Sequence, residues 1–170
     1  MQKKLINGLI AAALVASLSI AQARADESLS TLGVGFAFAP IGGHGFSFRN
    51  LPQSGFGYQC GTIFWKSGES SYFNGGAELI YVLRHTENTA FYAPLGIAYS
   101  YKSDLAYRYD TNPPQQYRQT TNDVAGGGGL GFTARIKSWE NIWFSLDLVM
   151  YADKGDILHL PQGAIHYYFK

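Results

Sequence analysis

Proton transfer and nucleophilic attack need side chains such as histidine, serine and a carboxylate, and this sequence offers few of them close together. The histidines are spread along the chain, at His44, His85, His159 and His166. A triad-like set can be drawn from Ser47, His159 and Asp156, in which the carboxylate orients a base toward a hydroxyl. His44 is a second candidate base. Histidines that hydrogen-bond to nearby loops are the simpler interpretation of this set.

Metal ions and phosphate groups have no evident site either. No cluster of His, Cys or carboxylate residues has the spacing of metal ligands, so neither a metal nor another cofactor is expected. The glycine run Gly126–Gly129 could cradle a phosphate if it opened a helix. No helical pattern follows it, and neither does a Lys-Ser or Lys-Thr pair. The run therefore predicts close packing between strands or a sharp strand bend.

Composition narrows the choice of elements that carry these residues. The chain has 170 residues, of which 46% are hydrophobic, 15% aromatic and 15% charged, and it contains 20 glycines. That length favours one domain, and the aromatic content argues against a disordered chain. A formal net charge of +1 gives no basic surface for nucleic acid. A chain rich in glycine and aromatic residues points to β structure.

The first 25 residues have the pattern of a secretory signal peptide. Two lysines precede the apolar stretch Leu5–Ile20, and the second of two Ala-x-Ala sites ends at Ala25. We expect residues 1–25 to be removed and residues 26–170 to form one exported domain, with a retained membrane anchor as the alternative. The single cysteine, Cys60, allows no disulfide within the chain. No run of 18 apolar residues occurs later in the sequence, so no membrane-spanning helix is predicted there.

Beyond residue 30 the sequence alternates between large apolar and small residues with a period of two, the pattern of β-strands. The alternation is strong in five segments: Thr31–Ala39, Tyr72–Arg84, Ala90–Lys102, Val124–Ile136 and Ile142–Tyr151. It is weaker in three more: His44–Asn50, Gly55–Lys66 and about Ile157–Phe169. In the last segment the phase slips around Pro161–Gly163, which predicts a bulge. We therefore expect eight strands.

The two faces of these strands differ in character. One face of the strong segments carries large aliphatic and aromatic side chains without a charge, and the other carries Gly, Ala and Ser with scattered charges. An eight-stranded barrel has a narrow lumen, and a lipid-facing exterior needs continuous apolar residues. The pattern predicts a closed, antiparallel, eight-stranded transmembrane β-barrel with the large face outward. A soluble periplasmic barrel, whose large face lines a cavity for an apolar ligand, is the alternative.

Some charged residues fall on the small-residue face and would enter the lumen. They are Arg49, Glu78, Arg84, Lys102, Arg135 and Asp147. Buried charges need partners, so we expect an interior salt-bridge network that fills the lumen. A narrow path for ions is the alternative.

The connection Ser103–Asp123 is the longest in the expected barrel. With an even strand count both ends of the barrel lie on one side of the membrane, and this fifth connection then falls outside the cell. It contains tyrosines and arginines, which are enriched at binding hot spots: Tyr107, Arg108, Tyr109, Tyr117 and Arg118. We expect this loop to contact a surface partner, with a variable loop that has no fixed partner as the alternative.

The signal peptide, the alternating strands and the last strand together resemble the small, eight-stranded outer-membrane β-barrel proteins of Gram-negative bacteria. In the last strand Ile165, Tyr167 and Phe169 are in phase, as in the terminal strands that the barrel-assembly machinery recognises in this family. The sequence departs from the family pattern by adding Lys170 and by placing Gly163 one position off the usual glycine.

The resemblance implies contact with outer-membrane lipids and lipopolysaccharide, and a structural or surface-interaction role without catalysis. Some members of the family modify lipid A, so a lipid A-modifying enzyme is the alternative function. Those deacylases carry His and Ser two positions apart on one strand, and no His-x-Ser sequence occurs here.

Overall fold

The computed structural model describes residues 32–108, 115–136, 138–153 and 156–169. The expected signal peptide, residues 1–25, and Tyr109 in the expected surface loop lie outside the described residues, so both stay predictions. Within the described ranges, no helix is long and apolar enough to cross a membrane.

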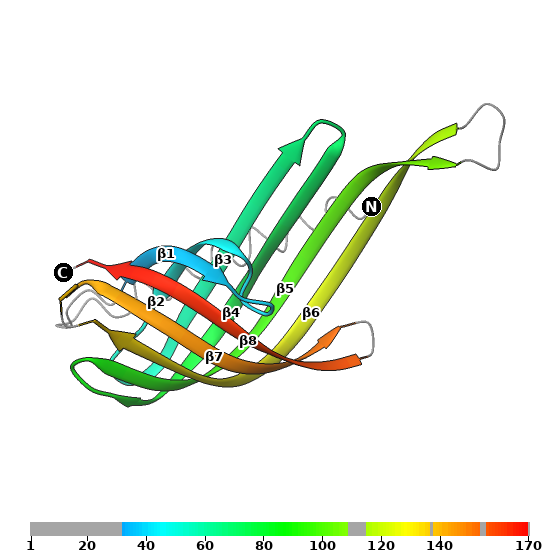
Figure 1. Cartoon of the computed structure of the whole chain (residues 1–170). Coiled ribbons are helices and arrows are strands. Elements are labelled where there is room, and N and C mark those ends of the chain that lie inside the picture. Colours follow the sequence, from blue (N-terminus) through cyan, green and yellow to red (C-terminus); the bar gives the residue numbers. More distant parts are fainter. Residues whose placement is uncertain (1–31, 109–114, 137, 154–155, 170) are drawn as a thin grey trace.

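The described chain forms eight antiparallel strands whose hydrogen bonding closes into one ring. The strands are β1 (Leu32–Phe38), β2 (Gly45–Asn50), β3 (Gly55–Ser67), β4 (Ser70–His85), β5 (Thr89–Arg108), β6 (Gln115–Arg135), β7 (Ile142–Asp153) and β8 (Asp156–Tyr168). Each strand pairs with its neighbours in the sequence, and β8 returns to pair with β1. The predicted all-β class and the closed, antiparallel, eight-stranded barrel are therefore confirmed. Figure 1 shows the β5–β6 hairpin reaching furthest from the ring, far beyond the short strands β1 and β2.

The large apolar face lies on the outside of the barrel. Leu79 of β4 pairs with Leu95 of β5, and Leu95 is 64% exposed, as is Leu148 of β7. The residues that alternate with them point inward and are fully buried, among them Ile80 and Val149. This confirms the predicted orientation, and the alternative with the large face lining an internal cavity is wrong for this barrel. An exterior of exposed leucine and phenylalanine side chains is the surface that a lipid bilayer requires.

The glycine run lies within β6, where it lets two strands approach each other. A Cβ atom added at Gly127 would lie 2.2 Å from the carbonyl oxygen of Met150, and one at Gly129 would lie 2.1 Å from that of Leu148. Both distances are far below van der Waals contact, so β6 and β7 can pair closely only because these positions carry no side chain. This agrees with the prediction of close strand packing.

The segment predicted as a long loop, Ser103–Asp123, is instead mostly strand. β5 continues to Arg108, β6 begins at Gln115, and the two strands stay paired up to these residues. The prediction ended the strands where the apolar alternation ends. Beyond that point both faces of the hairpin carry polar residues, while residues such as Tyr107 and Tyr117 still favour an extended backbone.

The connection between β1 and β2, which we call the inward turn (residues 39–44), folds into the barrel. Ile41 is fully buried, and Gly43 has a φ of +84°, a conformation that glycine adopts readily. A Cβ atom at Gly43 would lie 2.2 Å from a carbonyl oxygen of β3. The backbone N–H of His44 donates a hydrogen bond of 2.6 Å to Asn74 Oδ1 on β4. The inward turn is thus held against β3 and β4 inside the ring.

The register of β8 corrects a second expectation. β8 pairs with β7 without interruption through Pro161, so the bulge predicted at Pro161–Gly163 does not occur in these described pairs. The apolar phase changes in the sequence because Leu158 and Leu160 lie on the same inward face as the buried Gln162. Near the β7–β8 hairpin the inward positions of β8 are therefore apolar, whereas toward the end of β8 they include the polar Gln162 and His166.

Candidate functional site

The lumen holds buried polar side chains from five strands. We call this set the lumen cluster: Arg49, Glu78, Tyr92, Ser145, Asp147 and Gln162. Arg49 is its cation and is 1% exposed. The guanidinium carbon of Arg49 lies 4.6 Å from the centroid of the Tyr92 ring, in cation–π contact, and Nη1 donates a hydrogen bond to Ser145 Oγ.

One amide links the two carboxylates of the lumen cluster. Gln162 Nε2 donates hydrogen bonds to Glu78 Oε1 at 2.7 Å and to Asp147 Oδ2 at 2.8 Å. The Tyr92 hydroxyl donates another hydrogen bond to Asp147 Oδ1. Because a buried polar group without a partner is costly, these bonds stabilise the two buried carboxylates, Glu78 and Asp147. The cluster ties β4, β5, β7 and β8 together across the lumen.

Three of the charges predicted to share the lumen belong to the lumen cluster, and three do not. Arg84 is exposed, because a register shift between Val82 and Arg84 turns it to the outer face of β4. Lys102 extends from β5 beyond the closed part of the ring, where it forms an ion pair of 2.9 Å with Asp104. The hydrogen bond from Lys102 lowers the pKa of the Asp104 carboxyl. The prediction of one shared interior network is therefore corrected for these residues.

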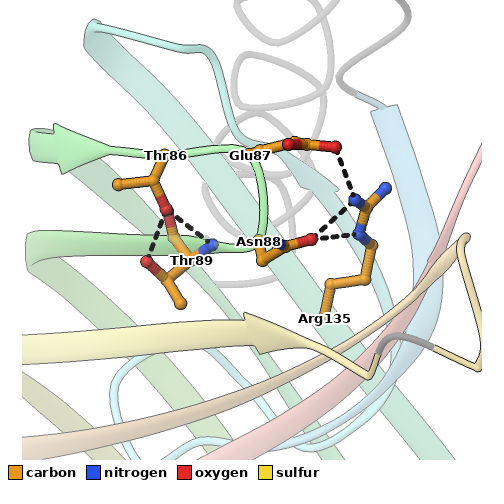
Figure 2. Close-up of polar contacts among 5 residues, drawn as sticks. All are labelled: Thr86, Glu87, Asn88, Thr89 and Arg135. Atoms are coloured by element: carbon orange, nitrogen blue, oxygen red, sulfur yellow. Dashed lines mark hydrogen bonds and ion pairs between the residues drawn. The ribbon is translucent and has the colours of Figure 1, made fainter.

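Arg135, the third residue outside the cluster, lies at the end of the barrel opposite the β5–β6 hairpin tip. Figure 2 shows its guanidinium beside the turn between β4 and β5: Nη2 donates to Asn88 Oδ1 at 2.6 Å and lies 3.5 Å from Glu87 Oε1. Within the turn, Thr86 Oγ1 accepts a hydrogen bond of 3.1 Å from the backbone N–H of Thr89. Arg135 thus holds a turn in place rather than pairing within the lumen.

The candidate catalytic set is not assembled. Ser47 points into the barrel, and its hydroxyl lies 2.9 Å from Nε2 of His166, with both residues buried. His159 lies on the outward face of β8, in register with an exposed methionine of β7. Asp156 begins β8 at the tip of the β7–β8 hairpin. The three residues chosen for a triad therefore lie on different faces and at different heights of the barrel.

The remaining histidine candidates have structural partners. His44 Nδ1 accepts a hydrogen bond of 3.0 Å from the backbone N–H of Ala39, within the inward turn. Ser47 and His166 lie in one row of the ring, with Gly35 of β1 between them. A serine and a histidine at this distance have the geometry of a nucleophile and a base. Their burial keeps a substrate out, so we assign the pair to lumen packing.

The β5–β6 hairpin beyond residue 103, which we call the surface hairpin, presents the expected tyrosines and arginines on two faces. Tyr107 and Arg118 lie on the face continuous with the barrel exterior, and Tyr117 and Arg108 lie on the opposite face. Arg118 forms an ion pair of 3.1 Å with Glu69 in the β3–β4 turn. Both tyrosines are about half exposed. The surface hairpin is thus a paired element with two distinct faces.

The expected assembly signal lies where the sequence predicts it. Ile165, Tyr167 and Phe169 share the outward face at the end of β8, and each is nearly half exposed. The Tyr167 and Phe169 rings are 5.5 Å apart, and Asn141 Nδ2 donates a hydrogen bond of 3.0 Å to the Tyr167 hydroxyl. Recognition of these residues by the barrel-assembly machinery stays a prediction.

The sequence patterns did not indicate the two residues that hold the carboxylates of the lumen cluster, Tyr92 and Gln162. For Tyr92 the available signal was a large polar side chain on a face that continues as Pro94, Gly96, Ala98 and Ser100. Gln162 gave no such signal, because Leu158 and Leu160 lie on its face of β8. Among the residues that the structure describes, no group of three or more His, Cys, Asp or Glu side chains could hold a metal ion.

No family model matches this sequence, and no curated protein matches it. Among solved structures, the chain is similar to the N-terminal β-barrel domain of Pseudomonas aeruginosa OprF, with a TM-score of 0.46 and 11% identity, over 81% of this chain and 95% of that chain. It is also similar to the Yersinia pestis outer membrane protein Ail in a phospholipid bilayer nanodisc, with a TM-score of 0.39 and 15% identity, over 84% of this chain and 100% of that chain. Likeness at this level transfers no partner and no site residue to this chain.

Proposed function

We propose that the mature chain is a non-enzymatic outer-membrane β-barrel that displays the surface hairpin as its contact surface outside the cell. The observation that carries this proposal is an apolar exterior continued by a paired, polar hairpin on one side only. Membrane barrels face lipid with apolar residues, and their longer connections lie on the extracellular side. The exterior would contact outer-membrane lipids and lipopolysaccharide, and the end of β8 would be recognised by the barrel-assembly machinery.

Aromatic residues near both ends of the apolar exterior support this placement. Near the hairpins, the rings of Phe73 and Tyr99 are 6.3 Å apart, and near the opposite end those of Trp139 and Phe144 are 6.4 Å apart. Aromatic residues are enriched where a membrane meets water. Past Phe73 and its neighbours the outward positions become polar, as at Ser71. The surface hairpin then extends into water.

The surface hairpin has the properties of a recognition element. Strand pairing and the Arg118–Glu69 ion pair hold it in a defined shape, so binding would cost less ordering entropy than for a flexible loop. Gln116 Nε2 donates a hydrogen bond of 3.0 Å to the Tyr107 hydroxyl, which orients that ring. Tyrosine and arginine on such a scaffold are the residue types that dominate binding energy.

The placement can be tested by labelling cysteines in intact cells. In a Cys60→Ala background, Gln116→Cys in the surface hairpin should react with a membrane-impermeant maleimide. Glu87→Cys, in the turn at the opposite end, is the matched control and should react only after the outer membrane is broken. The protein should fractionate with outer membranes and shift its gel mobility on boiling. Recovery as a soluble protein, or labelling of Glu87→Cys alone in intact cells, would contradict the proposal.

The absence of catalysis has its own test. Lipid A from cells that express the chain and from cells that lack it should have the same mass spectrum, because Ser47, His159 and Asp156 are not brought together. A mass difference that disappears with His159→Ala or His44→Ala would replace the proposal with a lipid A-modifying activity.

A further inference from the structure

The hydrogen-bonded ring is complete only in the half of the barrel where β1 begins and β8 finishes. β1 stops pairing with β8 at Gly163, and β2 stops pairing with β3 at Thr62. Among the described residues, positions 156–162 of β8 pair only with β7, and positions 63–67 of β3 pair only with β4. Two strands are missing from the ring there, a width of three strand spacings or about 14 Å. We call this interruption the lateral opening.

Pro161 fits the free edge that the lateral opening creates. Proline has no N–H to donate to a sheet and occurs mainly in edge strands. Pro161 stands in the middle of β8, in register with Leu148 of β7, on the stretch that has no second partner strand in the described chain. The sequence is therefore compatible with β8 being an edge at this height.

Exposed apolar side chains occur on both faces of the edge strands at the lateral opening, and His159 and Lys66 are the polar residues of the outward face. On the inward face Trp65 is 64% exposed, and Leu158 and Leu160 are each 41% exposed. On the outward face of the same segments Phe64 and Ile157 are also exposed. In the part of the barrel where the ring is closed, the inward residues of the lumen cluster are polar and buried. Exposed apolar residues that gather on an otherwise polar interior mark a binding surface.

Strand register fixes these side chains toward the interior. Leu160 pairs with Val149, which is fully buried inside the barrel. Trp65 pairs with Tyr72, which lies two positions from the inward and buried Asn74. The buried Ile41 of the inward turn lies inside the ring between the polar lumen and the hairpin end. An occupant of the opening would therefore meet Trp65 and the two leucines at the edges, with Tyr72 and Lys102 next to Trp65 in the same inward row, and would not meet the lumen cluster.

The lateral opening reaches the upper margin of the apolar exterior. Phe64 pairs with Phe73, which pairs with Tyr101, so an outward aromatic row crosses β3, β4 and β5 at this height. The next outward positions of β3 and β4 are Lys66 and Ser71. Below this margin the exterior is in contact with acyl chains if the barrel spans a membrane. On the β3 edge the apolar surface thus continues from Phe64 on the exterior to Trp65 at the opening, whereas His159 interrupts the outward face on the β8 edge.

We propose that an acyl chain of lipopolysaccharide enters the barrel through the lateral opening and packs against Trp65, Leu158 and Leu160. This inference rests on the proposed outer-membrane placement, in which the hairpin end faces the outer leaflet and hence lipopolysaccharide. The continuity of the opening with the lipid-facing exterior is the argument for this occupant. A second copy of the chain that paired along β8 would satisfy its free edge, but would leave the inward leucines uncovered.

Lipid retention by the purified barrel tests this proposal. The mature protein is extracted from outer membranes in a mild detergent, and bound lipopolysaccharide and phospholipid are counted by native mass spectrometry. The double variant Leu158→Gln/Leu160→Gln should retain at least fivefold less lipopolysaccharide than the natural chain. Ile157→Gln, on the outward face of the same strand, is the matched control and should retain it. A mobility shift on boiling checks that each variant is folded.

Tryptophan fluorescence gives a second measurement that does not need the leucine variants to fold. In Trp139→Phe/Trp143→Phe, the remaining Trp65 should emit at shorter wavelength when lipopolysaccharide is added to delipidated protein. The control is Phe64→Trp/Trp65→Phe in the same background, which moves the tryptophan to the outward face of β3, where detergent already covers it. The emission wavelength of this control should change little when lipopolysaccharide is added.

Several results would overturn the inference. Equal lipid retention in all three proteins, or no change at Trp65, would mean that the opening holds no acyl chain. Retention of phospholipid in place of lipopolysaccharide would refute the stated source, and a dimer mass without lipid would assign the free edges to a second copy. Cysteine labelling reports the membrane placement separately. Failure of this inference with correct labelling leaves the proposed function standing.

Discussion

The closed half and the open half of this barrel are built from the same strands, yet different interactions hold them. In the closed half, inward side chains from five strands meet in the lumen cluster, where the Gln162–Glu78 and Arg49–Ser145 hydrogen bonds join strands that are not neighbours. In the open half, β3 to β6 continue as hairpins that hold together by backbone pairing and by surface contacts such as Arg118–Glu69. Fold specificity is therefore concentrated in the closed half, and the open half keeps its side chains available for contacts.

The difference originates in β1 and β2. These strands end early, and the inward turn occupies the interior at the height where they stop. Beyond their ends, toward the hairpins, β1 and β2 contribute no wall to the ring in the described chain. On the inward face of the edge strands, Trp65 and the leucines of β8 stand there, and Lys102 of β5 keeps a polar residue in the same row as Trp65. Substitutions in the two halves should consequently differ in their effects on stability.

The largest effect is expected from Asp147→Ala in the closed half. This change removes the acceptor of the Tyr92 hydroxyl and one of the two acceptors of Gln162, and it takes away one of the two carboxylates that face the buried Arg49 in the lumen cluster. Removing one member of a buried charged network costs about 3–5 kcal/mol. The free energy of unfolding in urea, measured with the barrel in lipid vesicles, should fall by that amount. Lys102→Ala, in an exposed ion pair of the open half, is the control and should leave it nearly unchanged.

A smaller effect is expected from Gly131→Ala. A Cβ atom there would lie 2.2 Å from the Tyr92 ring and 2.3 Å from Asp147 Oδ1, so the lumen cluster would have to shift. Overpacking of this kind costs about 1–3 kcal/mol. Gly126→Ala on the same strand is the matched control, since its nearest neighbour is 3.7 Å away. If both variants unfold at the same urea concentration, the lumen cluster is not the packed unit described above.

Much of the closed half could be predicted from the sequence. Period-two alternation depends on neighbouring residues alone, so it identified the strands, the outward apolar face and the inward placement of Glu78 and Asp147. The partners Tyr92 and Gln162 were missed because the meeting of side chains across a lumen depends on strand register, which a single sequence does not specify. Arg84 was assigned to the wrong face because a one-residue register shift reverses inside and outside.

The open half was less predictable, for a physical reason. The apolar alternation ends near Lys102 and Val124, although the backbone pairing of β5 and β6 continues to Arg108 and Gln115. In the proposed placement, this is where contact with lipid would end. The inward turn was taken for an ordinary connection because its position depends on glycines of distant strands, such as Gly61 and Gly76, against which it packs. The change of phase at Leu158 and Leu160 was interpreted as a bulge, although these residues share the inward face with Gln162. The two leucines are exposed and Gln162 is buried, a difference in environment that the sequence does not show.

The smallest effect is expected from Arg118→Ala in the surface hairpin. Its side chain is 54% exposed and that of its partner Glu69 is 66% exposed, and ion pairs in water contribute about 0.2–1 kcal/mol. A double-mutant cycle with Glu69→Ala should give a coupling energy in this range that decreases as salt is added. A coupling energy comparable to the cost of Asp147→Ala would mean that the surface hairpin is part of the folded core. A small, salt-dependent value means that this hairpin can bind a partner without disturbing the barrel, because its contacts are energetically separate from the lumen cluster.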